Sequence, residues 1–235
     1  DASARCDQRW DAGSFSVGAV LRAPDDALEL RLDGSAASRF PSGDELYLAG
    51  SAPTSPVHAL GDPSLGRETT LGFSPTIQLR LPLLHVGLSG FVHVIDDFIQ
   101  LAPDLAEDGS AQFVVTVRGA APSFSYRPVD ALFSGFDGSL TVGPRWPVSL
   151  AADVAVVRGV DTADGAGLVG IPADRLGATL TLQPPPLGPL HDAFLAVRGD
   201  WVMEQTHVAP GADLAPPPPA YTLLGASIGV SIALC

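Results

Sequence analysis

Histidine and acidic side chains in segments rich in proline and glycine are the residues of this chain with the clearest potential for metal chemistry. His58 lies four residues before Asp62, and Glu204 lies three residues before His207. Imidazole nitrogens and carboxylate oxygens are common metal ligands, so the two segments could together bind a metal or a metal complex. Neither contains an H-E-x-x-H motif, and solvated loop histidines are the alternative interpretation. We therefore keep these four residues as metal-site candidates.

Catalytic and cofactor motifs are not evident in the sequence. The segment 165–170 (GAGLVG) has the spacing G-x-G-x-x-G, but Ile171 and Pro172 follow it, where a dinucleotide site needs a helix. We interpret it as a flexible loop. Neighbouring acids such as Asp96 and Asp97 would point to opposite faces of a strand and could not act together as acid and base. We expect no enzymatic activity and no cofactor.

Charge and hydropathy restrict the class of protein. The 26 acidic residues outnumber the 13 basic ones, all arginine, and the formal net charge of −13 excludes a nucleic-acid partner. Mean hydropathy is +0.26, yet no run approaches the roughly 18–20 apolar residues of a membrane helix. The apolar residues must therefore be distributed in another pattern.

That pattern has a period of two, which is typical of β-strands. Between Thr222 and Leu234, for example, apolar side chains alternate with small or hydroxylic ones. The same alternation recurs through the chain and predicts nine strands, over residues 14–22, 27–36, 68–82, 85–99, 130–142, 147–158, 174–183, 190–203 and 221–234.

The connections between these strands alternate in length. Short turns are expected at 23–27, 83–84, 143–147 and 184–189, and long polar loops at 37–68, 102–129, 159–174 and 204–220. Outer-membrane barrels have short periplasmic turns and long extracellular loops. We therefore predict an all-β fold, an antiparallel up-and-down transmembrane β-barrel segment with extracellular long loops. The alternative is a soluble secreted β-sandwich that binds a ligand.

Six stretches resemble, in the same order, motifs of the TonB-dependent receptors of the outer membrane of Gram-negative bacteria. They are Ala37–Gly50, Leu60–Phe73, Val92–Leu101, Tyr126–Leu140, Val169–Leu180 and Ala215–Ile232. Asp137 stands where the family pattern has glutamate. The positions that match the motifs are Arg39, Pro41, Glu45, Leu46, Tyr47, Glu68, Asp97, Phe98, Ile99, Gly135, Asp137, Pro172, Arg175, Tyr221, Leu223 and Leu224.

This resemblance implies that residues 1–235 are the C-terminal portion of a larger barrel of the 22-strand type, without a counterpart of the plug or the TonB-box. It implies energised uptake of a scarce nutrient such as a metal ion, a metal complex or a siderophore. Lipid and lipopolysaccharide would surround the barrel, and TonB would act through a segment missing here. The alternative function is a receptor-derived barrel piece that serves as a structural outer-membrane anchor.

Nine strands leave a meander whose first and last strands run in the same direction. Such a sheet cannot close by antiparallel pairing, so we expect a companion chain or an N-terminal part to supply the other strands and possibly the plug. The same topology places Cys6 outside and Cys235 in the periplasm. A membrane of about 30 Å would separate them, so we predict that they are not bonded to each other.

Overall fold

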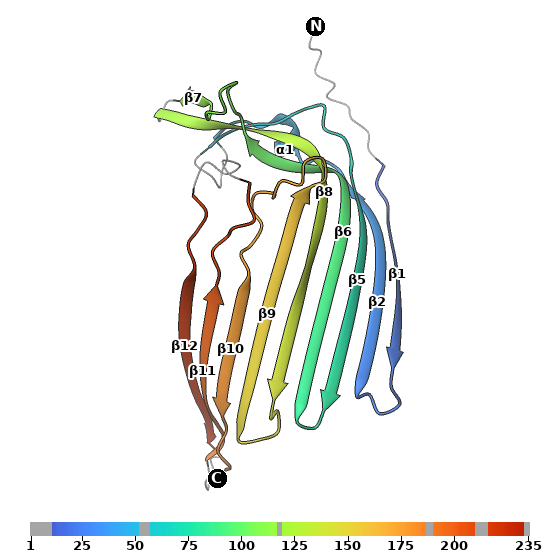
Figure 1. The fold of residues 1–235 in the computed structure, drawn as a ribbon, viewed down its shortest axis with the longest axis vertical. Helices are drawn as coiled ribbons and strands as arrows, with labels where there is room; N and C mark the ends of the chain where they lie inside the picture. Colours follow the sequence, from blue (N-terminus) through green and yellow to red (C-terminus); the bar gives the residue numbers. More distant parts are fainter. Residues whose placement is uncertain (1–10, 52–56, 117–118, 187–189, 210–215, 233–235) are drawn as a thin grey trace.

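The structure, a computed structural model, describes residues 11–51, 57–116, 119–186, 190–209 and 216–232. Within these ranges nine strands form one curved sheet, and their order in the sheet follows the chain (Figure 1). They are β1 (Ser14–Arg22), β2 (Leu28–Arg39), β5 (Glu68–Leu81), β6 (Leu84–Pro103), β8 (Gly119–Val142), β9 (Val148–Asp161), β10 (Arg175–Leu182), β11 (Leu190–Val202) and β12 (Tyr221–Ile232). Off this path lie helix α1 (Gly43–Tyr47) and the short strands β3 (Ala49–Ser51), β4 (His58–Leu60) and β7 (Phe113–Thr116).

Each of the nine predicted strands has a counterpart in this sheet, and the neighbouring pairs along the path are all antiparallel. The predicted all-β meander is therefore confirmed. The short turns meet at one end of the sheet and the longer connections at the other (Figure 1). At the β1–β2 turn, the Ala23 N–H donates to the carbonyl oxygen of Leu28 at 2.9 Å. Asp26 adopts a positive φ of 55° there, which a short polar residue tolerates in a tight turn.

The register of the strands separates the two faces of the sheet. Leu30 of β2 lies opposite Ile77 of β5, and Ile77 lies opposite Leu88 of β6. The adjacent row contains Glu29, Gln78 and Gly87 instead. Since successive residues of a strand point to opposite sides, the alternation in the sequence becomes one apolar and one polar surface.

The prediction of a long polar loop over 102–129 was wrong in its extent. β6 continues to Pro103 and β8 begins at Gly119, so the two strands form a hairpin that extends beyond the other strands. Pro122 and Pro128 lie within the paired part of β8, opposite Phe113 and Ile99 respectively, although proline cannot donate to a strand ladder. The pairing nevertheless continues across a bulge between Ile95 and Phe98. The register shifts there, so β6 can bend and remain paired with β8.

The predicted loop over 37–68 also contains ordered structure. Ser42 begins α1 with a reciprocal capping box: the Glu45 N–H donates to the Ser42 hydroxyl at 3.2 Å, and the Ser42 N–H donates to Glu45 Oε2 at 2.6 Å. These two bonds satisfy backbone donors that the first turn of a helix leaves free. β4 then pairs with β8 in parallel and fixes this segment above the sheet.

The sheet is a single layer, and its few buried apolar side chains gather near the ends that carry the longer connections. Leu46, Leu65 and Ile99 form one cluster, and Ile95, Ala131 and Leu168 form another. Among the described residues, no helix has the length and apolar character needed to cross a membrane. In the same part of the chain, β1 pairs with β2 alone and β12 with β11 alone, so the sheet does not close. Cys6 and Cys235 lie outside the described residues, and the prediction about them stays a prediction.

Candidate functional site

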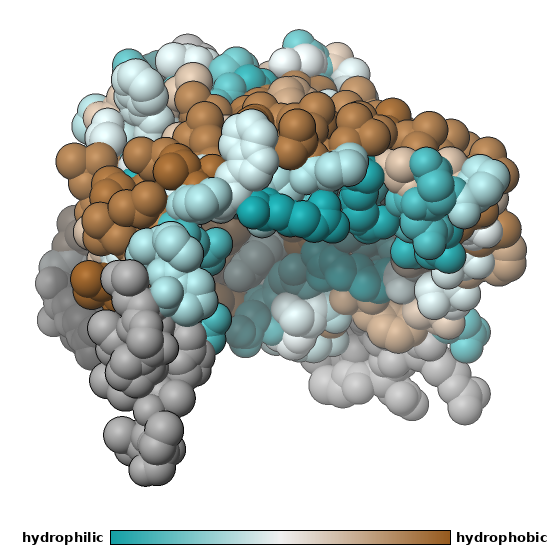
Figure 2. All heavy atoms as spheres, turned by 90° about the horizontal axis from the view of Figure 1, so that it is seen from below, coloured by the Kyte–Doolittle hydropathy of each residue, from teal (hydrophilic) through white to brown (hydrophobic). Residues whose placement is uncertain are grey.

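The polar side of the sheet lines its hollow. Figure 2 shows hydrophilic side chains inside the curve and apolar ones around its outer surface. We call this inner side the concave face. It is formed by two neighbouring rows of paired residues: Arg31, Thr76, Ser89, Asp137, Ala155 and Arg175, and Glu29, Gln78, Gly87, Ser139, Asp153, Gly177 and Asp200. The concave face therefore presents hydroxyl, amide and charged groups across seven strands, with Gly87, Ala155 and Gly177 between them.

A charged network crosses three strands of the concave face. Arg198 of β11 contacts Asp153 of β9 at 2.9 Å between Nη1 and Oδ1, and its Nε donates to the Asp200 carboxylate at 2.9 Å. Gly177 of β10 lies between them. A Cβ at Gly177 would come within 2.6 Å of Asp153 Oδ2 and would also meet Arg198. The glycine thus leaves the room in which the guanidinium passes over β10.

The sequence interpretation missed this network. Arg198 and Asp200 are two residues apart, which is the spacing of a same-face pair in a strand. A glycine inside a strand also indicates a close approach of other groups. Both features could have been recognised in the sequence. The partner Asp153 lies 45 residues from Arg198, however, and can be identified only when the register of β9, β10 and β11 is known.

Asp137 faces a polar pocket of about 370 Å³ on the concave face. The hydroxyls of Thr76 and Ser89 lie 3.1 Å apart in its wall, and Ser139 and Arg175 also line it. This pocket offers hydrogen-bond donors and acceptors to whatever occupies the hollow of the sheet.

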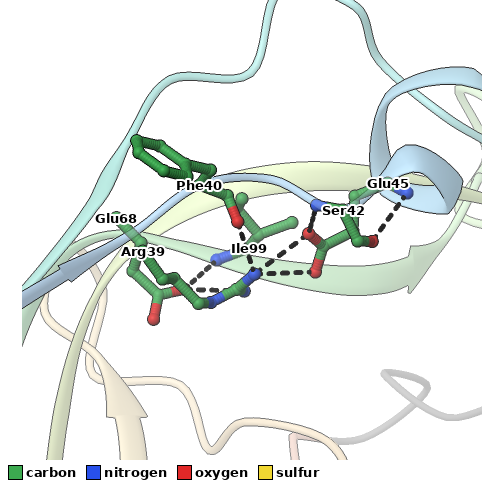
Figure 3. Close-up of polar contacts among 6 residues, drawn as sticks. All are labelled: Arg39, Phe40, Ser42, Glu45, Glu68 and Ile99. Carbon is green, nitrogen blue, oxygen red and sulfur yellow. Dashed lines mark hydrogen bonds and ion pairs between the residues drawn. The ribbon is translucent and has the colours of Figure 1, made fainter. Parts of the chain in front are cut away.

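A second group of charged side chains lies where β2 and β5 meet the longer connections (Figure 3). Arg39 Nη1 contacts Glu45 Oε2 at 3.0 Å, and Arg39 Nη2 contacts Glu68 Oε2 at 2.9 Å. The same Glu68 oxygen accepts the backbone N–H of Ile99 at 3.2 Å. The Glu68 side chain is only 9% exposed, whereas that of Arg39 is 42% exposed. Four of the motif positions thus form one contact group, which we call the rim cluster (Arg39, Glu45, Glu68 and Ile99).

The electrostatics of Glu45 follow from these contacts. Partial burial raises the pKa of the Glu45 carboxyl, but hydrogen bonds from Arg39 and Ser42 and the charge of Arg39 lower it by more. The pKa of Glu45 therefore lies below its ordinary value. The carboxylate form is the one that holds α1 against β2.

Apolar contacts hold the rim cluster in place. Leu46 of α1 packs with Leu65 and Ile99, and Tyr126 of β8 packs against them. Burial of Tyr126, together with the negative charges of Glu45 and Asp44, raises the pKa of its phenol. Pro41 is buried and Tyr47 is exposed. The contacts of these motif positions hold α1 and the longer connections against the sheet.

Asp97 and Phe98 lie at the bulge of β6. Asp97 has a positive φ of 55°, and its backbone N–H donates to Asp130 Oδ1 at 3.2 Å. The ring of Phe98 packs edge-on against Phe133, with centroids 5.1 Å apart. Gly135 is a second constrained position, because a Cβ there would meet the Val156 carbonyl and the Phe91 ring. These residues shape the wall where the strands bend.

The remaining motif positions lie on β10, β12 and the connections before them. Pro172, Arg175 and Tyr221 line a second pocket, of about 730 Å³. Leu223 lies in register with Asp200 on the concave face, whereas Leu224 lies on the outer surface and is 83% exposed. The structure thus brings Arg175 and Tyr221 to one pocket, although they are 46 positions apart.

The four metal-site candidates are distributed over two segments. His58 belongs to β4, and the Asp62 carboxylate accepts hydrogen bonds from both the backbone and the hydroxyl of Ser64. Glu204 and His207 lie in the connection from β11 to β12. Among the described residues, no three His, Cys, Asp or Glu side chains come together in a way that could hold a metal ion. The metal site stays a prediction.

Comparison with known families and structures supplies independent evidence. A family model described as TonB dependent receptor-like, beta-barrel matches residues 1–233. A comparison with curated protein sequences found no match.

Several solved structures share the fold. The copper transporter OprC has a TM-score of 0.70 and 19% identity, with 91% of this chain and 30% of that chain covered. The siderophore receptor PirA from Pseudomonas aeruginosa has a TM-score of 0.60 and 15% identity, covering 94% and 36%. The FrpB iron transporter from Neisseria meningitidis has a TM-score of 0.57 and 12% identity, covering 90% and 30%. This chain thus spans about a third of the length of the structures that it resembles.

Proposed function

Because the chain belongs to the TonB-dependent receptor β-barrel family, we propose that it forms the C-terminal wall of an outer-membrane receptor that imports a scarce nutrient. The nutrient classes are a metal ion, a metal complex or a siderophore. The family and the names of the structural relatives, which include a copper transporter and siderophore receptors, support this proposal.

The observation that carries the proposal is the two-faced sheet. Outward side chains such as Leu71, Ile77, Leu88 and Ile228 are 43–82% exposed although they are apolar. A contiguous apolar surface of this extent would be unfavourable in water, and lipid is the solvent that stabilises it. β1, with nine residues at about 3.3 Å each and a tilt of about 40°, would span about 23 Å, close to the apolar band of about 25 Å of such barrels.

The open edges indicate what the rest of the barrel must provide. β1 and β12 run in the same direction, and in hydrocarbon their unpaired N–H and C=O groups would be costly. A barrel closed by antiparallel pairing needs an even number of strands. An odd number of further strands must therefore be added to these nine to close the barrel. We assign these strands, and possibly the plug, to a companion chain or to an N-terminal part of the same polypeptide.

In this arrangement the longer connections with α1 lie on the extracellular side, and the short turns lie in the periplasm. Lipid and lipopolysaccharide would contact the outer surface. The concave face would line the passage, and TonB would act through a segment outside this chain.

Uptake measurements test the proposal. Cells that lack the gene, the complemented cells and cells without TonB would be grown in medium depleted of iron or copper, and cell-associated metal would be followed by mass spectrometry after resupply. We expect uptake to fall in the deletion and the TonB-deficient strain, and to return on complementation.

Uptake that is unchanged in both strains would contradict transport. If the chain were then found in the outer membrane within a multiprotein complex, the structural-anchor function would replace it. Recovery of the chain from the soluble fraction without detergent would instead favour a secreted β-sandwich.

A further inference from the structure

Arg175 differs from every other arginine that the structure describes. Of these ten arginines, nine donate to a carboxylate, an amide oxygen or a backbone carbonyl. The nine are Arg22, Arg31, Arg39, Arg67, Arg80, Arg127, Arg145, Arg158 and Arg198. Arg175 has no such partner among the described residues, and its side chain is exposed. The chain has 26 acidic residues, so an arginine without a partner of this kind is unusual in it. Such a guanidinium would attract an anion.

The surroundings of Arg175 form a ligand-sized cavity. The pocket of about 730 Å³ lies between the β9–β10 and β11–β12 connections, within the size range of small-molecule sites. Hydrogen bonds hold the two connections together: Gln205 Nε2 donates to the Ile171 carbonyl at 2.6 Å, and the Met203 N–H donates to the Asp174 carbonyl at 2.8 Å. Gln205 itself is buried and also lines the pocket, so a buried side chain holds the two connections together there.

The walls of this pocket are mainly apolar. Ile171, Pro172, Val202, Met203 and Tyr221 line it together with Arg175, and Glu204 contributes a carboxylate. An apolar enclosure with one free guanidinium suits an organic anion with an apolar body, because the walls cover the body while the guanidinium forms paired hydrogen bonds with the anionic group.

Arg175 also borders the polar pocket that contains Asp137, so the two cavities share this one side chain. Arg175 thus lines both the mainly apolar pocket of about 730 Å³ and the hydroxyl-rich pocket of the concave face. A ligand held by Arg175 in the pocket of about 730 Å³ would therefore lie next to the surface that lines the proposed passage.

We propose that the pocket around Arg175 binds an organic anion with an apolar body, with Arg175 as the group that binds its charge. This inference rests on the proposed receptor function and specifies its substrate class: the anionic organic molecule, alone or as a chelator, rather than a bare cation.

The test uses the intact receptor in lipid nanodiscs and two small probes, 2-naphthoate and its neutral isostere 2-naphthamide. Ligand-observed saturation-transfer NMR titrations give the dissociation constant of each. We expect the wild type to bind the carboxylate about tenfold more tightly than the amide, as a charge-assisted hydrogen-bonded pair would give. R175Q should abolish this preference. R145Q, which removes the same charge in the short β8–β9 turn, should retain it.

Two further measurements keep the result interpretable. Heat-modifiability in gel electrophoresis establishes that R175Q folds. A173W, which fills the pocket around Arg175, should weaken binding of both probes. Equal binding of the two probes to the wild type, a preference that survives in R175Q, or unchanged binding in A173W would each overturn the inference. None of these measurements needs transport, so their failure is distinct from failure of the uptake experiment.

Discussion

Replacement of Glu68 tests whether the rim cluster stabilises the wall as the geometry indicates. The Glu68 carboxylate is 9% exposed and accepts from both the Ile99 backbone and Arg39. In E68A the buried Ile99 N–H would lose its partner, which costs about 1–3 kcal/mol. Loss of the contact with the half-exposed Arg39 adds about 0.2–1 kcal/mol. The expected loss of unfolding free energy is therefore about 1–4 kcal/mol.

E68Q is the matched control, because glutamine keeps the length of the side chain and an oxygen that can accept the Ile99 N–H. It removes the charge alone, so we expect a loss below about 1 kcal/mol. Urea unfolding of the intact receptor in lipid vesicles, followed by tryptophan fluorescence, measures both variants. The reasoning would be refuted if E68A and E68Q were destabilised equally, since the buried N–H would then contribute nothing.

Three further perturbations probe other parts of the wall. The pKa of Glu45 is lowered in the folded state. The carboxylate therefore contributes fully to stability above the unfolded pKa near 4.5, and this contribution is lost as the pH falls through the folded pKa. The urea midpoint of the wild type should fall on acidification, and the midpoint of E45Q should fall less. G177V should cost about 1–3 kcal/mol by displacing the Arg198 network, whereas G225V, where no atom lies within 4 Å of the new Cβ, should be nearly neutral in the same assay. I77R should cost about 2–4 kcal/mol on the outer surface, and T76R on the concave face should cost much less; equal losses would contradict the assignment of the faces.

The sequence was sufficient for the nine main strands and their two faces because alternation is a local property. Residues such as Ile77 and Gln78 indicate by themselves which side each occupies. The capping box of Ser42 and Glu45 was also local, but it lies in a segment that we interpreted as loop. The extended part of β8 was missed because its pairing depends on β6 across the bulge, which no local pattern encodes.

The site was less accessible from the sequence. Arg39, Glu45 and Glu68 were chosen as motif positions, but their mutual contact requires the pairing of β2 with β5. The network of Asp153 and Arg198 depends on the register of three strands. Such long-range juxtapositions follow from the topology rather than from any spacing along the chain.

The proposed function requires the sheet to be a membrane wall with one lipid-facing and one water-facing surface. Nitroxide labels placed singly at positions 76–81 of β5 in the intact receptor, with both native cysteines replaced by serine, test this directly in native outer membranes. We predict that accessibility to oxygen peaks at positions 77, 79 and 81, while accessibility to a water-soluble nickel chelate peaks at 76, 78 and 80. Uniform accessibility to the nickel chelate along the strand would show that β5 has no lipid-facing side.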